Sequence, residues 1–172
     1  MTQKKSEKIS SELEVRLMTI DDLSPAFHLG EKLFTATRMP NLYHMWDEYE
    51  IIDFYHSSSE YCFSAILDEK LVGFLLSTII EKKRGKNILK FGYLVWTGVD
   101  PKIKGHGIGT KLFEKFKTKM IEEKVHTMIV DTQASNTEAL KFFYSKGFGH
   151  PHDHIYLSMD LSPHTTNGKD KK

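Results

Sequence analysis

The spacing of apolar residues predicts a strand and then a helix at the start of the folded body. Over residues 13–18 apolar and polar residues alternate, which is the period of a half-buried strand. Over residues 23–34 apolar residues recur at intervals of three and four, as on one face of a helix. Asp21 and Asp22 precede this segment, where acidic side chains stabilise a helix N-terminus.

A second helix is expected over residues 42–54, separated from the first by residues 35–40. Its predicted apolar face consists of Leu42, Met45, Trp46, Tyr49 and Ile52. Side chains at such spacing more often belong to a core than to a substrate platform, so we expect Trp46 and Tyr49 to be core residues.

Three strands follow, joined by short turns. Residues 61–67 and 71–80 are apolar runs separated by an Asp-Glu-Lys turn, and an Arg-Gly-Lys-Asn turn leads into a third strand that ends near Val99. Consecutive strands with tight turns form an antiparallel meander.

From Thr110 the period changes to that of a helix, with an opposite face rich in lysine and glutamate. Its predicted buried face consists of Leu112, Phe113, Phe116, Met120 and Ile121. Residues 128–130 are expected to form a short strand, and residues 154–161 the last one. Between them, Ser135 and Glu138 have capping-box spacing ahead of a further helix, and Gly147 is a suitable C-terminal stop.

The predicted order is a meander followed by a β-α-β-α-β half, so we expect an α/β fold with a mixed sheet flanked by helices. The polar ends, residues 1–12 and 162–172, are predicted to be disordered tails around one domain over residues 13–161. A chain of 172 residues is the size of one ordinary domain.

Composition narrows the class of protein. Hydrophobic residues make up 40% and charged residues 27%, as in a soluble globular protein, and no apolar run is long enough to span a bilayer. The N-terminus lacks the apolar segment of a secretory signal, and a single cysteine agrees with a reducing compartment, so we expect a cytoplasmic protein. That cysteine, Cys62, lies in an apolar run, which favours a buried, inert thiol. The net charge of +1 gives no general reason to expect nucleic-acid binding, although a local basic patch is compatible with it.

The segment between the third strand and the next helix contains glycines at alternate positions, Gly105, Gly107 and Gly109, with Lys104 and Lys111 beside them. Such a loop presents backbone N–H groups at a helix N-terminus, where they favour a bound phosphate, and side chains would hold that phosphate away. An ordinary glycine-rich turn is the alternative interpretation. The strand before the loop and the helix after it favour phosphate binding.

At these residues the chain resembles the GNAT N-acetyltransferases, whose motif is Arg/Gln-x-x-Gly-x-Gly/Ala after a Val-x-Pro strand end. Residues 99–101 and 104–109 match it, except that Lys104 replaces arginine or glutamine and lacks their planar geometry. A second match follows, with Asn136 and Ala139 before an aromatic-Tyr-x-x-Gly-Phe segment over residues 143–148. The resemblance covers residues 60–161 well.

The resemblance implies a site for acetyl-CoA as co-substrate, with a sheet splayed open between its two halves. It implies that the diphosphate binds the backbone amides of Lys104, Gly105, His106, Gly107, Ile108, Gly109 and Thr110, and that pantetheine runs beside Thr97, Gly98 and Val99. An amine would attack the thioester directly, and Tyr144 would protonate the departing CoA thiolate; packing on the helix face is the competing role for Tyr144. Asn136 would contact CoA, or else act at the helix N-terminus.

The third predicted strand supplies no evident base to deprotonate the amine. Residues 88–98 contain no carboxylate. Deprotonating a lysine side chain at neutral pH costs about 4–5 kcal/mol, whereas an α-amine costs only about 1–1.5 kcal/mol. This difference favours a peptide or protein α-amine, or another amine of low pKa, with proton transfer through water, Tyr93 or a histidine. Asp131 is a further candidate, and the alternative is that it only ends its strand.

Acceptor binding is predicted for Glu31, Phe34 and Tyr43, within a pocket that also draws on residues 38–43, Trp46 and the segment after Gly147. The Glu-x-x-Phe spacing of the first two resembles the peptide N-terminal and ribosomal-protein acetyltransferase branch.

Three alternate histidines, His150, His152 and His154, have the spacing of metal ligands on a strand, but a proline-containing loop explains them as well and the chemistry needs no metal. We expect no metal, no specific nucleic acid, no membrane contact, and a monomer or homodimer. The alternative function is a non-catalytic CoA-binding or interaction module on the same fold.

Overall fold

The computed structural model describes residues 13–34 and 46–152, and it divides after Asn136 into two compact units, each described by itself. The first unit contains the strands β1 (Glu14–Leu17), β2 (Phe63–Leu67), β3 (Lys70–Arg84), β4 (Asn87–Val99) and β5 (Thr127–Val130). Its helices are α1 (Leu23–Leu33), α2 (Glu48–Ser58) and α3 (Ile108–Glu122), with 3₁₀ turns at η1 (Ile20–Asp22), η2 (Ser59–Tyr61) and η3 (Pro101–Ile103). The second unit contains α4 (Thr137–Ser145).

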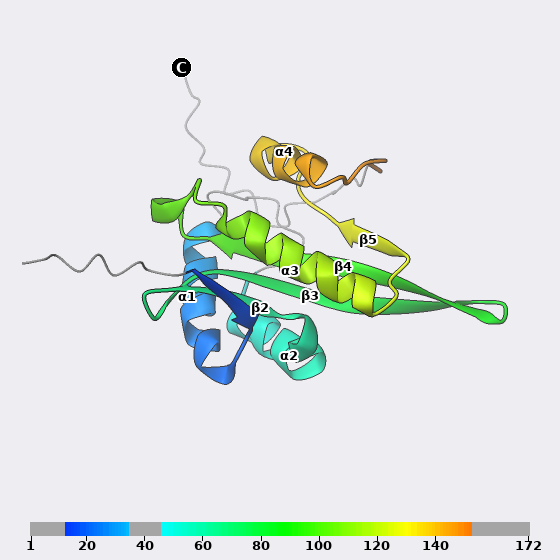
Figure 1. The fold of residues 1–172 in the computed structure, drawn as a ribbon, viewed down its shortest axis with the longest axis horizontal. Coiled ribbons are helices and arrows are strands. Elements are labelled where there is room, and N and C mark those ends of the chain that lie inside the picture. Colours follow the sequence, from blue (N-terminus) through cyan, green and yellow to red (C-terminus); the bar gives the residue numbers. More distant parts are fainter. Residues whose placement is uncertain (1–12, 35–45, 153–172) are drawn as a thin grey trace, which may run out of the picture. The chain divides into compact units, whose positions relative to one another are not determined.

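The predicted mixed α/β fold is confirmed. The sheet has the order β1-β2-β3-β4-β5, in which β1 to β4 are antiparallel and β5 runs parallel to β4 (Figure 1). The parallel step is made by α3, which returns the chain to the same end of the sheet, as a β-α-β unit requires. No helix in the part of the chain that the structure describes is long and apolar enough to cross a bilayer. The predicted strand over residues 154–161 lies outside the described residues.

An aromatic cluster fills the space between the sheet and the pair α1 and α2. Trp46 lies against Phe74 of β3 and Trp96 of β4, with ring centroids 5.2 Å apart in both pairs. Phe34, at the end of α1, contacts the same group, 4.7 Å from the Trp96 ring. The indole N–H of Trp46 donates to the Phe27 carbonyl at 3.0 Å, so its one polar atom is satisfied.

Helix α3 covers the opposite face of the sheet, as Figure 1 shows. Its buried side chains are Ile108, Leu112, Phe113, Phe116 and Met120. Two strand glycines make room for them, because a Cβ on Gly92 would lie 2.5 Å from the Met120 sulfur and one on Gly73 3.2 Å from Leu112.

The sequence prediction was wrong about two apolar faces. Helix α2 begins at Glu48 rather than at residue 42, so Tyr49 and Ile52 point outward with 69% and 49% of their surface exposed. Asp47 explains the shift, because its carboxylate accepts the Glu50 N–H at 2.9 Å and caps the helix there. On α3, Ile121 is 67% exposed, since it lies one position beyond the buried Met120.

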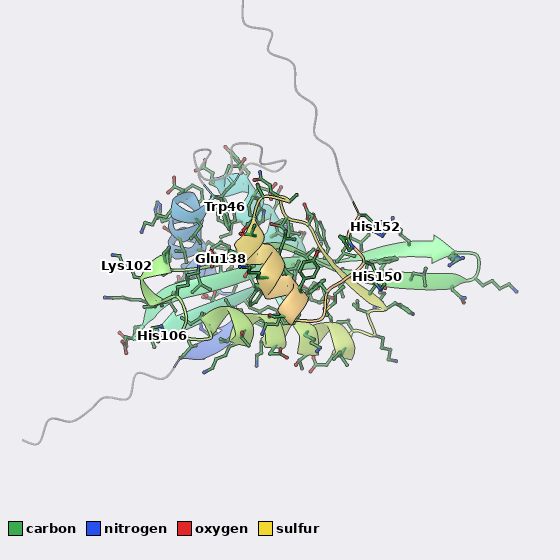
Figure 2. The ribbon with its side chains drawn as sticks, turned by 90° about the horizontal axis from the view of Figure 1, so that it is seen from above. Trp46, Lys102, His106, Glu138, His150 and His152 are labelled. Carbon is green, nitrogen blue, oxygen red and sulfur yellow. The ribbon has the colours of Figure 1, made fainter. Side chains whose placement is uncertain are left out.

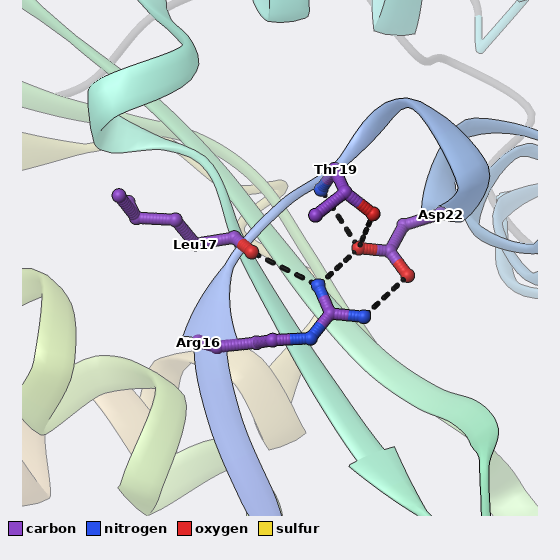
Figure 3. A network of polar contacts seen from close by, with 4 residues as sticks. All are labelled: Arg16, Leu17, Thr19 and Asp22. Carbon is purple, nitrogen blue, oxygen red and sulfur yellow. Dashed lines mark hydrogen bonds and ion pairs between the residues drawn. The ribbon is translucent and has the colours of Figure 1, made fainter.

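A buried carboxylate joins β1 to the start of α1 (Figure 3). Asp22 accepts hydrogen bonds from both terminal nitrogens of Arg16, at 2.6 and 3.0 Å, and from the Thr19 N–H at 2.8 Å. Burial alone would raise the pKa of the Asp22 carboxyl, but these hydrogen bonds outweigh it and hold the pKa below its usual value. Asp22 therefore acts as an anchor for the chain entering α1, not only as the acidic helix start predicted from the sequence.

The second unit is a helix with a well-defined end. Helix α4 stops at Ser145, and Gly147 follows with φ of 92°. The Phe148 N–H donates to the Phe143 carbonyl at 3.1 Å and the Gly147 N–H to the Tyr144 carbonyl at 3.1 Å, which closes the last turn. The predicted role of Gly147 as a helix stop is confirmed.

Candidate active site

The edge of β4 is open where the predicted cofactor segment lies. Strand β5 pairs with β4 only from Phe91 to Leu94, so among the described residues no strand pairs with the β5 side of residues 95–99. On their other side these residues continue to pair with β3, up to Gly73 opposite Val99. Thr97, Gly98 and Val99 therefore form the half-open end of the sheet, where an extended group can lie alongside the backbone.

A β-bulge in β4 coincides with this opening. The register with β3 shifts between Leu76 and Ser77, so that Val95 is the extra residue. Before the bulge Gly92 faces Met120 of α3, whereas after it Trp96 belongs to the aromatic cluster under α1 and α2. The indole N–H of Trp96 donates to Oε2 of Glu50 at 3.1 Å, which ties this part of β4 to α2.

The glycine loop follows directly, and its backbone has the form that a phosphate cradle requires. Asp100 caps η3 by accepting the Lys102 N–H at 2.9 Å, and the chain then passes through Gly105 and Gly107 with φ of 88° and 75°. A Cβ on either glycine would meet no atom of the described residues within 4 Å, so they leave the space beside the loop backbone open.

Helix α3 starts at the end of this loop. The backbone N–H of Lys111 donates to the Gly107 carbonyl at 3.0 Å, so the amides of Ile108 and Gly109 precede the first hydrogen bond of this helix. His106 is fixed by a 2.9 Å hydrogen bond from its Nδ1 to the Ile103 carbonyl, which requires the proton on Nδ1. Figure 2 shows His106 and Lys102 on the turn that leads from β4 into α3.

The structure brings together two polar residues that the sequence left apart. Tyr93 of β4 lies opposite Ile129 in the parallel pairing with β5, and Asp131 follows two residues later. The Tyr93 hydroxyl donates to Oδ1 of Asp131 at 2.5 Å. Both side chains therefore project from the sheet face opposite α3, next to the point where β4 and β5 separate. The predicted β-α-β order allows these two strands to pair, but only their register brings the two residues together.

Other predicted residues have different surroundings. The space above Gly98 is taken by Leu33 of α1, 2.4 Å from where a Cβ would lie, so helix packing alone accounts for this glycine. Phe34 is half-buried and packs against the aromatic cluster. Glu31 is exposed, with its carboxylate 2.8 Å from Nδ1 of His28. Tyr43 and residues 38–42 lie outside the described residues.

The second predicted motif lies across the boundary between the two units. Asn136 ends the first unit, donates its N–H to the Gln133 carbonyl at 2.9 Å, and directly precedes α4, where a helix-capping residue stands. Tyr144 is on α4 with 52% of its surface exposed, so it does not pack as a core residue of that helix. His150 and His152 follow α4 and are exposed (Figure 2), while His154 lies outside the described residues.

Cys62 is buried, as predicted. Burial raises the pKa of its thiol to about 12, and the sulfur lies 3.3 Å from the Ser58 carbonyl. A thiol in this setting stays protonated at neutral pH and does not act as a nucleophile.

Comparison with known proteins identifies the family. The human N-alpha-acetyltransferase 30 is 30% identical over 95 residues, covering 55% of this chain and 25% of the relative, so the chain spans about a quarter of that protein's length. Among solved structures, an aminoglycoside N-acetyltransferase in complex with CoA has a TM-score of 0.69 at 19% identity, covering 87% of this chain and 96% of that one. The NatC complex bound to Gag peptide and CoA has a TM-score of 0.65 at 22% identity, covering 82% and 87%, and at such identities both structures show the fold alone. The family model described as Acetyltransferase (GNAT) family matches residues 30–149, well over half of the sequence, and this chain belongs to that family.

Proposed function

We propose that this protein transfers an acetyl group from acetyl-CoA to a primary amine, with a peptide or protein α-amine as the acceptor. The observation that carries the proposal is the open edge of β4 over residues 95–99, which leads without interruption into the positive-φ glycine loop before α3. The open strand edge can hold the extended pantetheine chain of CoA, and the glycine loop can hold its diphosphate. Family membership and the N-alpha-acetyltransferase relative support the same reaction.

The residues present fit the co-substrate. The amides of Gly105 to Thr110 would hold the diphosphate of acetyl-CoA, because they sit at a helix N-terminus beside open space. The backbone of Thr97, Gly98 and Val99 would pair with the pantetheine arm. Since Leu33 and Phe34 cover Gly98 on the α1 side, this pairing would use the strand edge and not the face of the sheet. The bound thioester supplies the acetyl group.

Tyr93 and Asp131 supply a route for the acceptor proton. The tyrosine oxygen can take a proton from the amine, directly or through water, as its own hydroxyl proton passes to the Asp131 carboxylate 2.5 Å away. A lysine ammonium has a reference pKa near 10.4 and an α-ammonium one near 8, so an α-ammonium gives up its proton to the same base more easily by about 2.4 pKa units. The pair therefore favours an α-amine acceptor. Tyr144 is proposed as the acid that protonates the CoA thiolate.

Two measurements on the full chain test the proposal in order. Calorimetry with acetyl-CoA should give saturable binding, and its absence would remove the assignment. Thiol release should then be followed with three peptides of one sequence: one with a free α-amine and no lysine, one acetylated at the N-terminus with a single lysine, and one blocked at both positions. We expect turnover with the first only. Faster turnover with the lysine peptide would refute the α-amine assignment, and binding without turnover of any amine would favour the non-catalytic module.

Single substitutions separate the proposed roles. Tyr144→Phe and Asp131→Asn should each lower kcat by about 100-fold, the usual scale for losing one acid or base, with acetyl-CoA affinity unchanged. Tyr49→Phe is the matched control, because this tyrosine is also on a helix and 69% exposed. Asp131→Asn should also recover activity at alkaline pH, where the α-amine is already neutral, whereas Tyr144→Phe should not. If Asp131→Asn lowers kcat by the same factor at every pH, Asp131 is not the proton acceptor.

A further inference from the structure

Strands β3 and β4 extend far beyond the rest of their sheet as a two-stranded ribbon, which we call the arm, residues 81–90. Strand β2 pairs with β3 only as far as Leu75, and β5 pairs with β4 only from Phe91 onward, whereas β3 and β4 stay paired out to Arg84 and Asn87. Figure 1 shows this hairpin reaching past α2, α3 and β5. Residues 81–88 are all exposed, so the arm contributes nothing to the core.

The arm is strongly basic in an otherwise balanced protein. It contains Lys82, Lys83, Arg84, Lys86 and Lys90 against the single acid Glu81, a net charge of +4, while the whole chain carries only +1. Glu81 is already used, because its carboxylate lies 3.7 Å from the Lys90 ammonium. Among the described residues the other four cations form no ion pair; Lys82 lies 6.0 Å from the centre of the Phe91 ring.

These four cations are distributed over both faces and the tip of the ribbon. Opposite residues of an antiparallel ladder share a face, and successive pairs alternate. Lys82 and Arg84 therefore project from one face, about 6.8 Å apart along the strand. Lys83, paired with Ile88, projects from the other face, and Lys86 is in the turn. A ribbon with positive charge on two opposite faces is complementary to a groove that has negative charge on both walls.

We propose that the arm docks into the major groove of duplex DNA and binds the phosphates on either side, without reading sequence. A ribbon with side chains on both faces is about 10 Å thick, and the major groove of B-form DNA, about 12 Å wide, admits such an element. The minor groove of B-form DNA is about 6 Å wide, and the major groove of A-form RNA is deep and narrow, so neither accepts the arm. The four cations are side chains that bind phosphate, and phosphate contacts carry no sequence information.

Two competing roles for the basic arm lead to different experimental outcomes. Lysines on an exposed two-stranded ribbon can simply prevent pairing with another chain, in which case the arm binds nothing. An anionic membrane also attracts lysines, but a segment that inserts into lipid needs exposed apolar side chains, and within the arm the only large exposed one is Ile88, 50% exposed. DNA binding is the role that uses the distribution of charge over both faces.

The test is fluorescence anisotropy of the full chain with a labelled mixed-sequence DNA duplex of about two helical turns. Four phosphate contacts predict that the logarithm of the binding constant falls with the logarithm of salt concentration with a slope of about −3.6, roughly a 150-fold loss between about 50 and 200 mM salt. The arm variant combines Lys82→Gln, Lys83→Gln, Arg84→Gln and Lys86→Gln. The matched control removes the same charge from exposed sites elsewhere, with Lys32→Gln, Lys70→Gln, Lys115→Gln and Lys141→Gln.

We expect the arm variant to lose at least about 50-fold in affinity at low salt and most of the salt slope, and the control variant to stay within about threefold. All substituted residues are exposed, so circular dichroism and thermal melting should be unchanged and an affinity loss cannot be attributed to unfolding. Equal loss in both variants would overturn the proposal, because it would show that only net charge matters. An A-form RNA duplex that binds as tightly, or binding to phosphatidylserine vesicles but not to DNA, would overturn it as well. Acetyl transfer is not used, so this test is independent of the proposed enzyme activity.

Discussion

Gly30 lies against Trp46, and this contact predicts that Gly30→Ala destabilises the protein when Trp46 is present and stabilises it when Trp46 is replaced by alanine. A Cβ on Gly30 would lie 2.1 Å from Cε2 of Trp46, 2.4 Å from Cζ2 and 2.5 Å from Nε1. Two of these atoms are carbons of a rigid ring held by Phe27, Phe34, Phe74 and Trp96, so the ring cannot move aside without breaking other contacts. In Gly30→Ala the indole would have to leave its place.

The magnitude follows from three contributions. Overpacking a core site costs about 1–3 kcal/mol, and losing the 3.0 Å hydrogen bond from Trp46 to the Phe27 carbonyl costs about 1 kcal/mol more. Replacing a mid-helix glycine by alanine returns about 1 kcal/mol of helix propensity. We therefore expect Gly30→Ala to destabilise the protein by about 2 kcal/mol. In a Trp46→Ala background, itself destabilised by about 3–5 kcal/mol, the clash is gone and Gly30→Ala should stabilise by about 0.5–1 kcal/mol.

Urea unfolding of the wild type, both single variants and the double variant measures the cycle. The expected coupling free energy between the two positions is about 3 kcal/mol, well above the roughly 0.5 kcal/mol scatter of independent sites. If Gly30→Ala stabilises the protein in both backgrounds, Trp46 does not lie on Gly30 and the helix-propensity contribution acts alone. If it destabilises equally in both, the cost comes from some other neighbour.

Three further predictions concern the loop, the buried carboxylate and the thiol. Gly107→Ala should weaken acetyl-CoA binding by more than about tenfold while lowering Tm by only about 2–4 °C, for the roughly 1 kcal/mol of backbone strain. Gly85→Ala is the control, because Gly85 also has a positive φ, 64°, and no described residue lies within 4 Å of an added Cβ; it should show the same Tm change and unaltered binding. Equal binding by both variants would contradict the phosphate cradle. The pKa of Asp22 is lowered in the folded protein, so the stability that its carboxylate contributes is present above the unfolded pKa near 4 and is lost as pH falls through the folded pKa. In urea unfolding, Asp22→Asn should therefore be less stable than the wild type at neutral pH, and the difference in free energy of unfolding should shrink at acidic pH. A difference that grows on acidification would refute this assignment. Cys62, with its pKa raised to about 12 by burial, should resist iodoacetamide in the native protein at mildly alkaline pH and react fully in concentrated urea, as mass spectrometry would show; rapid native labelling would mean that the thiol is accessible.

Local periodicity predicted the elements well because most of them bury a single face. α1 and, apart from Ile121, α3 follow the expected helical spacing, whereas the expected alternation of β1 fails at Leu17, which is 50% exposed. The turn Asp68-Glu69 has both residues at positive φ, 49° and 62°, as a two-residue hairpin requires. Where the prediction failed, on α2, the missing information was the cap. Asp47 and Glu50 have capping spacing, and with Asp47 as cap Trp46 and Ile51 occupy the two positions that pack together across a helix start. That signal was in the sequence but weaker than the apolar spacing.

The candidate site was predictable only in part, because its residues depend on two different kinds of information. The glycine loop is local, so its sequence pattern alone indicated the positive φ that Gly105 and Gly107 adopt. Tyr93 and Asp131 are 38 residues apart in sequence, and their contact depends on the register between β4 and β5. Helix α3 separates these two strands along the chain, so neither strand's sequence alone predicts the register. Phe34, assigned to acceptor binding from a short spacing, packs against the aromatic cluster, and its role toward an acceptor stays a prediction.

The bulge at Val95 connects the fold to the proposed chemistry. Had β4 kept a regular alternation, Trp96 and Gly98 would face α3 as Gly92 does, and the aromatic cluster under α1 would lose the indole that contacts Phe34 at 4.7 Å. The extra residue turns the second half of the strand over and strengthens its twist at the residue where β5 stops pairing. The same irregularity thus gives α1 and α2 a surface to pack on and separates β4 from β5. An opening built in this way is maintained by core packing, through Trp96 and its bond to Glu50, and does not depend on a ligand to hold it apart.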